Sequence, residues 1–218
     1  MDEEYDIVPA TEGDSERVAE FLRQTFFKYE PLNIAFKAPP NRPMEAMRFL
    51  KYLKEGTSLI AITKSGLLIG LAMNGVSRKT TEARVPRSRG LEAFHESYTK
   101  ISNFVDKVEN NMDIWKITGV ESALYLHILA VDPIASGRGI GTKLVKKSIE
   151  VAKSKGFPSL WVMCSSHYSA KICRSLGMQS VYRLPYKDNK NEAGKPEFLP
   201  PAPHTEINMF VLNLTKAD

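Results

Sequence analysis

Apolar side chains recur along much of the chain at intervals of three and four residues, the spacing of helices that bury one face. Proline, glycine and polar clusters separate these stretches and mark where each helix ends. The predicted helices cover residues 11–29, 43–55, 91–110 and 139–155, and a short fifth helix covers residues 165–176.

Compact apolar runs lie between the helices and predict strands. They cover residues 5–9, 58–63, 67–77, 124–131, 160–164, 181–186 and 207–214. The second and third form a hairpin around Lys64-Ser65-Gly66, whereas the proline-containing residues 36–43 and the polar residues 78–90 are expected to be connections. Strands that alternate with helices around one mixed sheet predict a layered domain of the α/β or α+β class. The length suits a single domain over residues 1–218.

The first helix has recognisable boundaries. Thr11 followed by Asp14 resembles a capping box at its start. It is expected to end near Tyr29, because Pro31 biases Glu30 away from helical backbone angles. This ending predicts that Glu30 lies exposed on a corner.

Composition narrows the classes of protein. No apolar run reaches the roughly 18 residues of a membrane span, and residues 1–4 are acidic where a secretion signal is basic. Cys164 and Cys173 are the two cysteines, and they are interpreted as ordinary buried thiols rather than an acyl-cysteine site. The net charge is +5, but the cationic residues are spread along the chain. We therefore expect a cytoplasmic monomer that binds neither nucleic acid nor membrane.

The most distinctive segment follows the apolar run 124–131. It reads Ser136-Gly137-Arg138-Gly139-Ile140-Gly141 and leads into a lysine-rich helix. Glycines let successive backbone N–H groups converge on an anion, and the helix adds its free N–H groups and positive dipole end. A nucleotide P-loop is excluded because Thr142-Lys143 has the wrong order, and a dinucleotide fold is excluded because Cys164-Ser165-Ser166 replaces the required acid. The segment predicts another kind of phosphate-binding loop.

The loop resembles the acetyl-CoA pyrophosphate loop of the GNAT acyltransferase superfamily, whose pattern is Arg/Gln-x-x-Gly-x-Gly/Ala. Gly139 and Gly141 match, and Ser136 stands where Arg or Gln is usual. Residues 26–33 (FFKYEPLN), 164–170 (CSSHYSA) and 201–204 (PAPH) also resemble the insect arylalkylamine N-acetyltransferases. The resemblance implies the GNAT fold, a mixed and mostly antiparallel sheet that is flanked by helices and splayed between its fourth and fifth strands.

The same resemblance implies acetyl-CoA as co-substrate. Strand backbone at the end of the central run would pair with the pantetheine arm, and the glycine loop would hold the pyrophosphate. The implied cofactor-binding residues are Leu129, Ala130, Val131, Ser136, Gly137, Arg138, Gly139, Ile140, Gly141, Thr142, Ser169 and Lys171. No metal is expected, because the four histidines are scattered without ligand spacing.

Acetylation of an amine requires a base, because alkylamines are mostly protonated near neutral pH. In the resembling enzymes the glutamate of the Glu-Pro-Leu block has this role, which implies Glu30 here. By itself, a glutamate after a helix is more often a solvated acid. His127, in the central strand beside Tyr125, is the competing base or a locally bonded strand histidine.

The segment after the strand at 160–164 carries candidate hydrogen-bonding groups. Ser165 and Ser169 match the serines that contact the thiolate and organise substrate in the insect enzymes. Helix capping by Ser165 or Ser166 is a structural alternative, and Tyr168 is a candidate proton donor because its pKa lies near that of a thiol.

The resemblance therefore implies direct acetyl transfer, in a ternary complex, to a small arylalkylamine such as dopamine, serotonin, tyramine or tryptamine. Agmatine, a polyamine or another aliphatic amine is the alternative within the enzyme class, and a protein amine stays open. A non-catalytic acyl-CoA-binding GNAT domain and a basic nucleic-acid-binding module are the alternatives of other classes.

Overall fold

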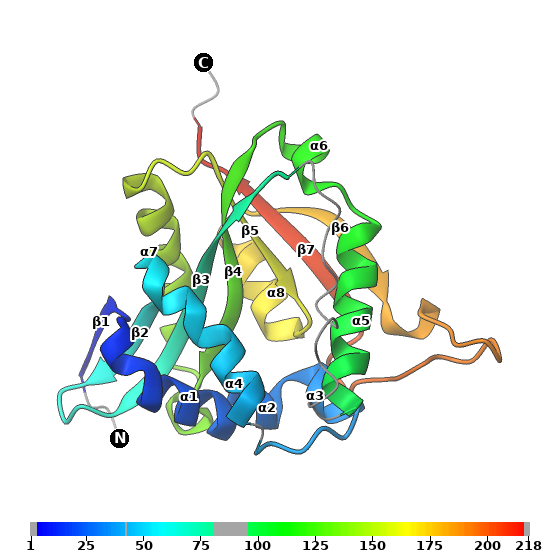
Figure 1. The fold of residues 1–218 in the computed structure, drawn as a ribbon, viewed down its shortest axis with the longest axis horizontal. Coiled ribbons are helices and arrows are strands. Elements are labelled where there is room, and N and C mark those ends of the chain that lie inside the picture. Colours follow the sequence, from blue (N-terminus) through cyan, green and yellow to red (C-terminus); the bar gives the residue numbers. More distant parts are fainter. Residues whose placement is uncertain (1–3, 42, 81–95, 216–218) are drawn as a thin grey trace.

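The computed structural model describes residues 4–41, 43–80 and 96–215, without the side chains of residues 43–45. Within these ranges, seven strands form one sheet in the order β1-β2-β3-β4-β5-β7-β6 (Figure 1). Only the β4–β5 pair is parallel among them, and the other pairs are antiparallel. The strands are β1 Tyr5–Pro9, β2 Leu59–Thr63, β3 Leu68–Arg78, β4 Ser122–Val131, β5 Ser159–Cys164, β6 Gln179–Pro185 and β7 Glu206–Asn213.

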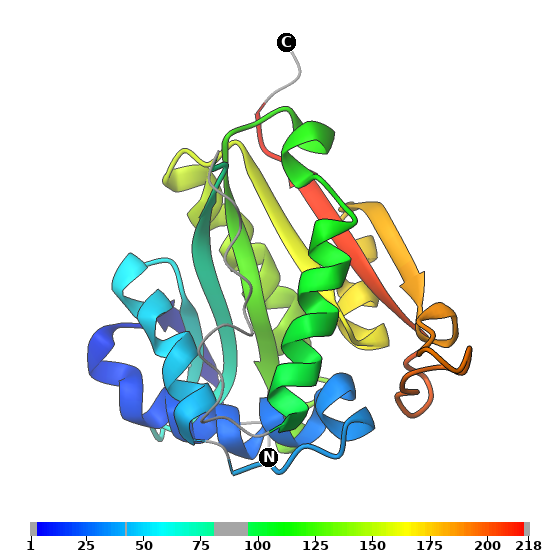
Figure 2. The same cartoon turned by 45° about the vertical axis from the view of Figure 1, so that its right-hand side comes forward.

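Helices cover both faces of the sheet. One face carries α7 and α8, and the other carries α1, α4 and α5; Figure 2 shows α5 in front of the sheet and α8 behind it. The α-helices are α1 Ser15–Gln24, α2 Phe26–Tyr29, α3 Pro31–Ala35, α4 Pro43–Leu50, α5 Glu96–Asn110, α6 Ile114–Thr118, α7 Ile140–Ser154 and α8 His167–Ser175. Short 3-10 turns are η1 Glu12–Asp14, η2 Lys51–Glu55, η3 Pro133–Ala135 and η4 Tyr186–Asp188.

The two faces of the sheet bury separate apolar clusters. On the α7 side, Leu144 and Val145 pack against Leu124 and Leu126 of β4, all at most 1 % exposed. On the other side, α1 and α4 cover β3 and the end of β4, and α5 covers the middle of the sheet. Full burial of such a side chain contributes about 1.5–3 kcal/mol, so these clusters hold β4 in place from both sides.

The strands β4 and β5 pair over a short stretch and then separate. Residues 124–126 lie opposite residues 160–162, and no pairing follows between the two strands, both of which are fully described. The edge of β4 from His127 to Val131 therefore faces an opening in the sheet. The predicted fold class, with its splay between the fourth and fifth strands, is confirmed.

A bulge in β4 lies at the start of this opening. On β3, Met73 faces Ile128 and Asn74 faces Leu126, so His127 is an extra residue in β4. A bulge bends its strand and increases the local twist. It also places His127 and Ile128 on the same face of the sheet.

Most elements follow their local patterns. The capping box at Thr11 and Asp14 is present, and the hairpin at residues 64–66 forms as expected. The helix predicted over residues 43–55 changes character after Leu50, becoming the 3-10 turn η2. Residues 81–95 lie outside the described part, and with them most of the predicted connection and the start of the third helix.

Two short helices were not predicted. α3 begins with Pro31 directly after its N-cap residue, Glu30, and α6 begins after Asp113, whose carboxylate accepts two backbone N–H groups. Each is one turn long, so a periodic apolar pattern cannot develop in it. In the described part of the chain, no helix has the length and apolar character needed to cross a membrane.

Candidate active site

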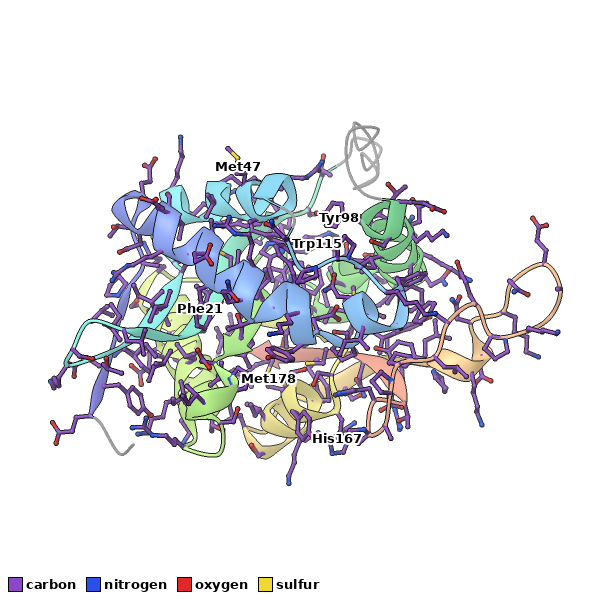
Figure 3. The ribbon with its side chains drawn as sticks, turned by 90° about the horizontal axis from the view of Figure 1, so that it is seen from below. Phe21, Met47, Tyr98, Trp115, His167 and Met178 are labelled. Atoms are coloured by element: carbon purple, nitrogen blue, oxygen red, sulfur yellow. The ribbon has the colours of Figure 1, made fainter. Side chains whose placement is uncertain are left out.

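A cleft of 410 Å³ lies at the opening between β4 and β5. Its lining comes from both faces of the sheet: Tyr98 of α5 and Tyr52 of η2 on one side, and Gly141 of α7 and Ile172 of α8 on the other. Figure 3, seen from below, shows Tyr98 and His167 projecting from these two layers. The cleft therefore reaches from the glycine loop side to the α5 side through the sheet.

Glu30 lies inside this cleft rather than on an exposed corner, so the predicted exposure was wrong. It is the N-cap residue of α3, and its side chain turns back toward that helix. Its Oε2 atom accepts the backbone N–H of Asn33 at 2.9 Å and the Nδ2 of Asn33 at 2.6 Å. Its Oε1 atom accepts the hydroxyl of Ser165 at 2.6 Å. The carboxylate thus joins α3 to the elbow between β5 and α8.

Burial raises the pKa of Glu30 above its ordinary 4.5, because loss of hydration penalises the carboxylate. The hydrogen bonds from Ser165, from Asn33 and from the backbone of Leu32 favour the carboxylate and oppose this rise. The balance leaves a carboxyl group that can both take and release a proton closer to neutral pH than a surface glutamate can.

Tyr186 supports the elbow from behind. Its hydroxyl donates to the backbone carbonyl of Ser165 at 2.7 Å, and the side chain is 1 % exposed. Burial and the charge of Glu30 raise the pKa of Tyr186, so the hydroxyl stays protonated and remains a donor. Its ring packs against Phe104 of α5 and against Phe198. This aromatic cluster fixes the position of the elbow relative to α5.

The other serines of this segment divide the capping and hydrogen-bonding roles. Ser166 caps α8 by accepting the backbone N–H of Tyr168 at 3.1 Å, while Ser169 donates to the carbonyl of Ser166 at 3.0 Å. Ser165 does not cap the helix but binds Glu30. Ser165, Ser166, Tyr168 and Ser169 all line the cleft, with Tyr168 61 % exposed.

His127 sits in a stack of aromatic rings. Its ring centroid lies 4.0 Å from that of Tyr52 and 3.9 Å from that of Tyr125, which in turn stacks on Trp161 at 3.7 Å. The Nε2 atom of His127 lies 2.8 Å from the position that a Cβ on Gly75 would take. The imidazole stacks on Tyr52, meets Tyr125 at a tilt and has Nε2 close to β3. His127 lines the same cleft as Glu30, whose carboxylate bonds Ser165.

Gly75 makes this stack sterically feasible. A Cβ there would lie 2.6 Å from the ring of Tyr52, closer than real contacts allow. We expect Gly75→Ala to lower the free energy of unfolding by about 1–3 kcal/mol through overpacking. Urea denaturation measures this, with Gly13→Ala as the control because its Cβ would make an ordinary 3.5 Å contact. Equal stability of the two variants would contradict the proposed packing.

The glycine loop adopts the backbone conformation that its sequence predicts. Gly137 and Gly139 have φ values of 80° and 72°, in the left-handed region where a side chain is strained. The first turn of α7 then presents backbone N–H groups without an intrahelical acceptor. Arg138 and Lys143 place their cationic groups 5.4 Å and 4.8 Å from the centroid of the Tyr5 ring. Two cationic side chains thus lie beside the start of α7 and the left-handed glycines.

The implied cofactor residues fall into two groups. Leu129, Ala130, Val131, Gly141 and Ser169 line the cleft. Ser136, Gly137, Arg138, Gly139, Thr142 and Lys171 lie outside its lining, on the loop and on α7 and α8. The side chain of Ile140 is 1 % exposed and belongs to the core, so only its backbone is available to a ligand.

The two cysteines are free thiols with their sulfur atoms 3.7 Å apart, both buried. The hydrogen bond with Cys164 and burial raise the pKa of Cys173, which keeps this thiol protonated. Within the described ranges, no group of three or more His, Cys, Asp or Glu side chains is arranged to hold a metal ion.

Several residues of the site were missed by the sequence reasoning. Asn33, Tyr186 and Tyr52 contact the candidate residues directly. For Asn33 a signal was present, since it stands three residues after the N-cap glutamate Glu30 and two after Pro31, which opens the helix. Tyr186 and Tyr52 come from distant segments, and no local pattern marks them.

A known protein family matches the part of the chain that forms one side of the cleft. Residues 104–178 match the Acetyltransferase (GNAT) family, and this stretch includes β4, the glycine loop, α7, β5 and α8. The chain therefore has the fold of this family, in agreement with its split sheet.

Three solved structures that are similar over nearly the whole chain are insect enzymes. Arylalkylamine N-acetyltransferase 2 from Aedes aegypti is 28% identical, with a TM-score of 0.88, and the aligned region covers 97% of this chain and 99% of that chain. Mosquito arylalkylamine N-acetyltransferase like 5b is 25% identical, with a TM-score of 0.83 and coverage of 97% and 100%. A Drosophila melanogaster polyamine N-acetyltransferase, which forms N-acetylagmatine, is 25% identical, with a TM-score of 0.80 and coverage of 97% and 100%. These neighbours confirm the resemblance to the insect arylalkylamine group.

Proposed function

We propose that this chain is an acetyl-CoA-dependent N-acetyltransferase that acetylates the primary amine of a small arylalkylamine. The observation that carries the proposal is the hydrogen bond between Ser165 and Glu30 inside the cleft at the β4–β5 opening. It supplies an enclosed carboxylate with a raised pKa beside the expected path of an acyl donor. We take residues 1–218 to be one catalytic domain that acts as a monomer.

The residues present fit acetyl-CoA. Gly137 and Gly139 allow the loop to turn its N–H groups toward a pyrophosphate, with Arg138 and Lys143 adding positive charge. The edge of β4 at residues 129–131 is unpaired toward β5, so its backbone can bond the amides of a pantetheine arm. When bound, this co-substrate supplies the acetyl thioester, and a thiol leaves after transfer.

Glu30 prepares the amine for attack. Its carboxylate attracts the ammonium group and removes one proton, so that the N–H bond breaks, an O–H bond forms and the electron pair stays on nitrogen. Partial burial of the carboxylate lowers the local polarity and strengthens both effects. Ser165 holds the carboxylate in place, and Ser169 lines the same cleft as a hydrogen-bonding group for the departing sulfur.

The charges of the cleft favour a monocationic amine. Among its described lining residues, Glu30 is the one carboxylate, whereas Arg48 and Lys51 add positive charge. Tyr98, Ile101 and other aromatic and apolar side chains form much of the remaining wall. An aromatic ring suits such a wall, whereas the second cation of agmatine or a polyamine would enter without an acidic partner.

The test is the rate of thiol release from acetyl-CoA across a panel of amines. We expect kcat/KM for dopamine, serotonin, tyramine or tryptamine to exceed that for agmatine, spermidine and a lysine peptide by about tenfold or more. Preference for agmatine or spermidine would instead establish the aliphatic alternative, which is supported by the similarity to the Drosophila enzyme that forms N-acetylagmatine.

A further inference from the structure

The hydrogen bonds on Glu30 divide unequally between its two oxygens. Oε2 accepts two N–H donors, both from Asn33, at 2.9 Å and 2.6 Å. Oε1 accepts the hydroxyl of Ser165 at 2.6 Å. Asn33 is 4 % exposed, so it is a buried residue whose amide is directed at this carboxylate.

The two kinds of donor respond differently when the carboxylate takes up a proton. The backbone N–H of Asn33 can only donate, and its amide could accept only after turning its carbonyl toward Oε2, so in the observed arrangement a proton on Oε2 would face two other hydrogen atoms. A hydroxyl can turn and accept, so Ser165 can bond Oε1 in either protonation state. Oε1 is therefore the oxygen on which a proton costs no hydrogen bond.

We propose that Asn33 is a positioning residue that keeps Oε2 of Glu30 unprotonated and directs the proton of the substrate amine onto Oε1, beside Ser165. In this step one N–H bond of the ammonium group breaks and an O–H bond forms at Oε1. The carboxyl group becomes neutral, and the Ser165 hydroxyl changes from donor to acceptor. That the proton comes from a substrate amine rests on the proposed function. That Glu30 takes up a proton on Oε1 rather than Oε2 does not rest on it.

Other ionisable groups surround Glu30, but the side chains that bond its carboxylate are those of Asn33 and Ser165, beside the backbone N–H groups of Leu32 and Asn33. Tyr186 lies behind Ser165 and stays protonated. Groups from the surrounding elements are Tyr29 of α2, Arg48 of α4, Lys51 and Tyr52 of η2, Tyr98 of α5, Tyr125 and His127 of β4, Cys164 of β5 and Tyr168 of α8. Any charge among them acts on both oxygens, and the side-chain contrast between Oε1 and Oε2 comes from Ser165 and Asn33.

The experiment is a pH titration of Glu30 by carbon NMR of protein labelled in the glutamate carboxyl groups, with Glu30→Gln assigning the signal. In Asn33→Ala the backbone donor remains and the amide donor is lost, so we expect the midpoint to rise by about one pH unit. Asn189→Ala is the matched control, since Asn189 is 1 % exposed and its amide donates to Glu197 at 2.9 Å. An unchanged midpoint in Asn33→Ala, or an equal rise in Asn189→Ala, would overturn the proposal.

The unsubstituted protein provides a second measurement that does not depend on folding of a variant. If Oε2 stays unprotonated, the side-chain amide protons of Asn33 remain in slow exchange with solvent on both sides of the Glu30 midpoint. A large increase in the solvent-exchange rate of these amide protons as Glu30 becomes protonated would overturn the proposal. Neither measurement requires turnover, so inactivity toward every amine would contradict the proposed function and leave the NMR result to decide the role of Asn33.

The kinetic readout connects the positioning role to catalysis. In Asn33→Ala the acidic limb of the kcat/KM profile should move by the same amount as the NMR midpoint, and saturation with acetyl-CoA should be unchanged. A uniform loss of kcat with no movement of the limb would show a purely structural role and overturn the assignment.

Discussion

Glu30→Gln should lower kcat by roughly 10²–10⁴-fold while acetyl-CoA binds as before. Glutamine has nearly the same shape, its carbonyl can accept from Asn33, and its amide can donate to Ser165, so the hydrogen-bonded frame around residue 30 is kept. What is lost is the ability to take a proton. Steady-state rates of thiol release and isothermal calorimetry with acetyl-CoA measure the two quantities separately.

The pH profile supplies the second part of this test. If ionised Glu30 is the base, kcat/KM should rise as the pH increases through a pKa above the ordinary 4.5. This rise, the acidic limb of the pH profile, should be absent in Glu30→Gln. The comparison variant is His127→Gln, which should keep this rise because the imidazole packs against the rings of Tyr52 and Tyr125. Loss of the limb in His127→Gln, with its retention in Glu30→Gln, would make His127 the base.

Gly139→Val should weaken acetyl-CoA binding by about 10–100-fold. Gly139 has a φ of 72°, and a β-branched residue in this left-handed region is strained by about 1–2 kcal/mol or more. The loop is expected to relieve the strain by rotating peptide groups, which turns N–H donors away from the pyrophosphate. Calorimetry gives the change in Kd, and thermal unfolding gives the change in stability.

Gly156 provides a matched control at the other end of the same helix. It follows α7 with a φ of 73°, and a Cβ there, as at Gly139, would meet no atom within 4 Å. Gly156→Val should therefore cost similar stability without changing the affinity for acetyl-CoA. Equal affinities of the two variants would show that the glycine loop does not hold the cofactor.

The parts of the fold that were predictable are those with local causes. The helix α7 has an apolar period, a glycine loop before it and Gly156 after it, and all three lie within one stretch of sequence. The strand pairs of the hairpin likewise depend on neighbouring residues. The separation of β4 from β5 was implied by family resemblance alone, because no composition or period in either strand encodes it.

The environment of Glu30 could not be read locally. Its partner Ser165 is 135 positions away, and Tyr186, which fixes the backbone of Ser165, is 21 positions further along the chain. Pro31 correctly indicated that the helix would end, but the chain then starts α3 and folds the carboxylate inward. The local pattern predicted an exposed corner, but tertiary contacts place the carboxylate in the cleft, where it is partly buried.

The extra residue in β4 was also beyond local prediction. The apolar run over residues 124–131 gives no sign of an extra residue, and the bulge is recognised only from the pairing with β3. Its position at His127 depends on Gly75, which leaves room for the rings of Tyr52 and His127. The histidine was therefore proposed as a base before its place in an aromatic stack was visible.

The most direct measurement of the proposed chemistry is a joint assay of both products with tyramine as the amine. We expect released CoA thiol and N-acetyltyramine, quantified by mass spectrometry, to form in equal amounts and only when both substrates are present. Acetyl-CoA binding without N-acetylated product, from tyramine or from any amine of the panel, would contradict the proposed enzyme and favour an acyl-CoA-binding domain without catalysis.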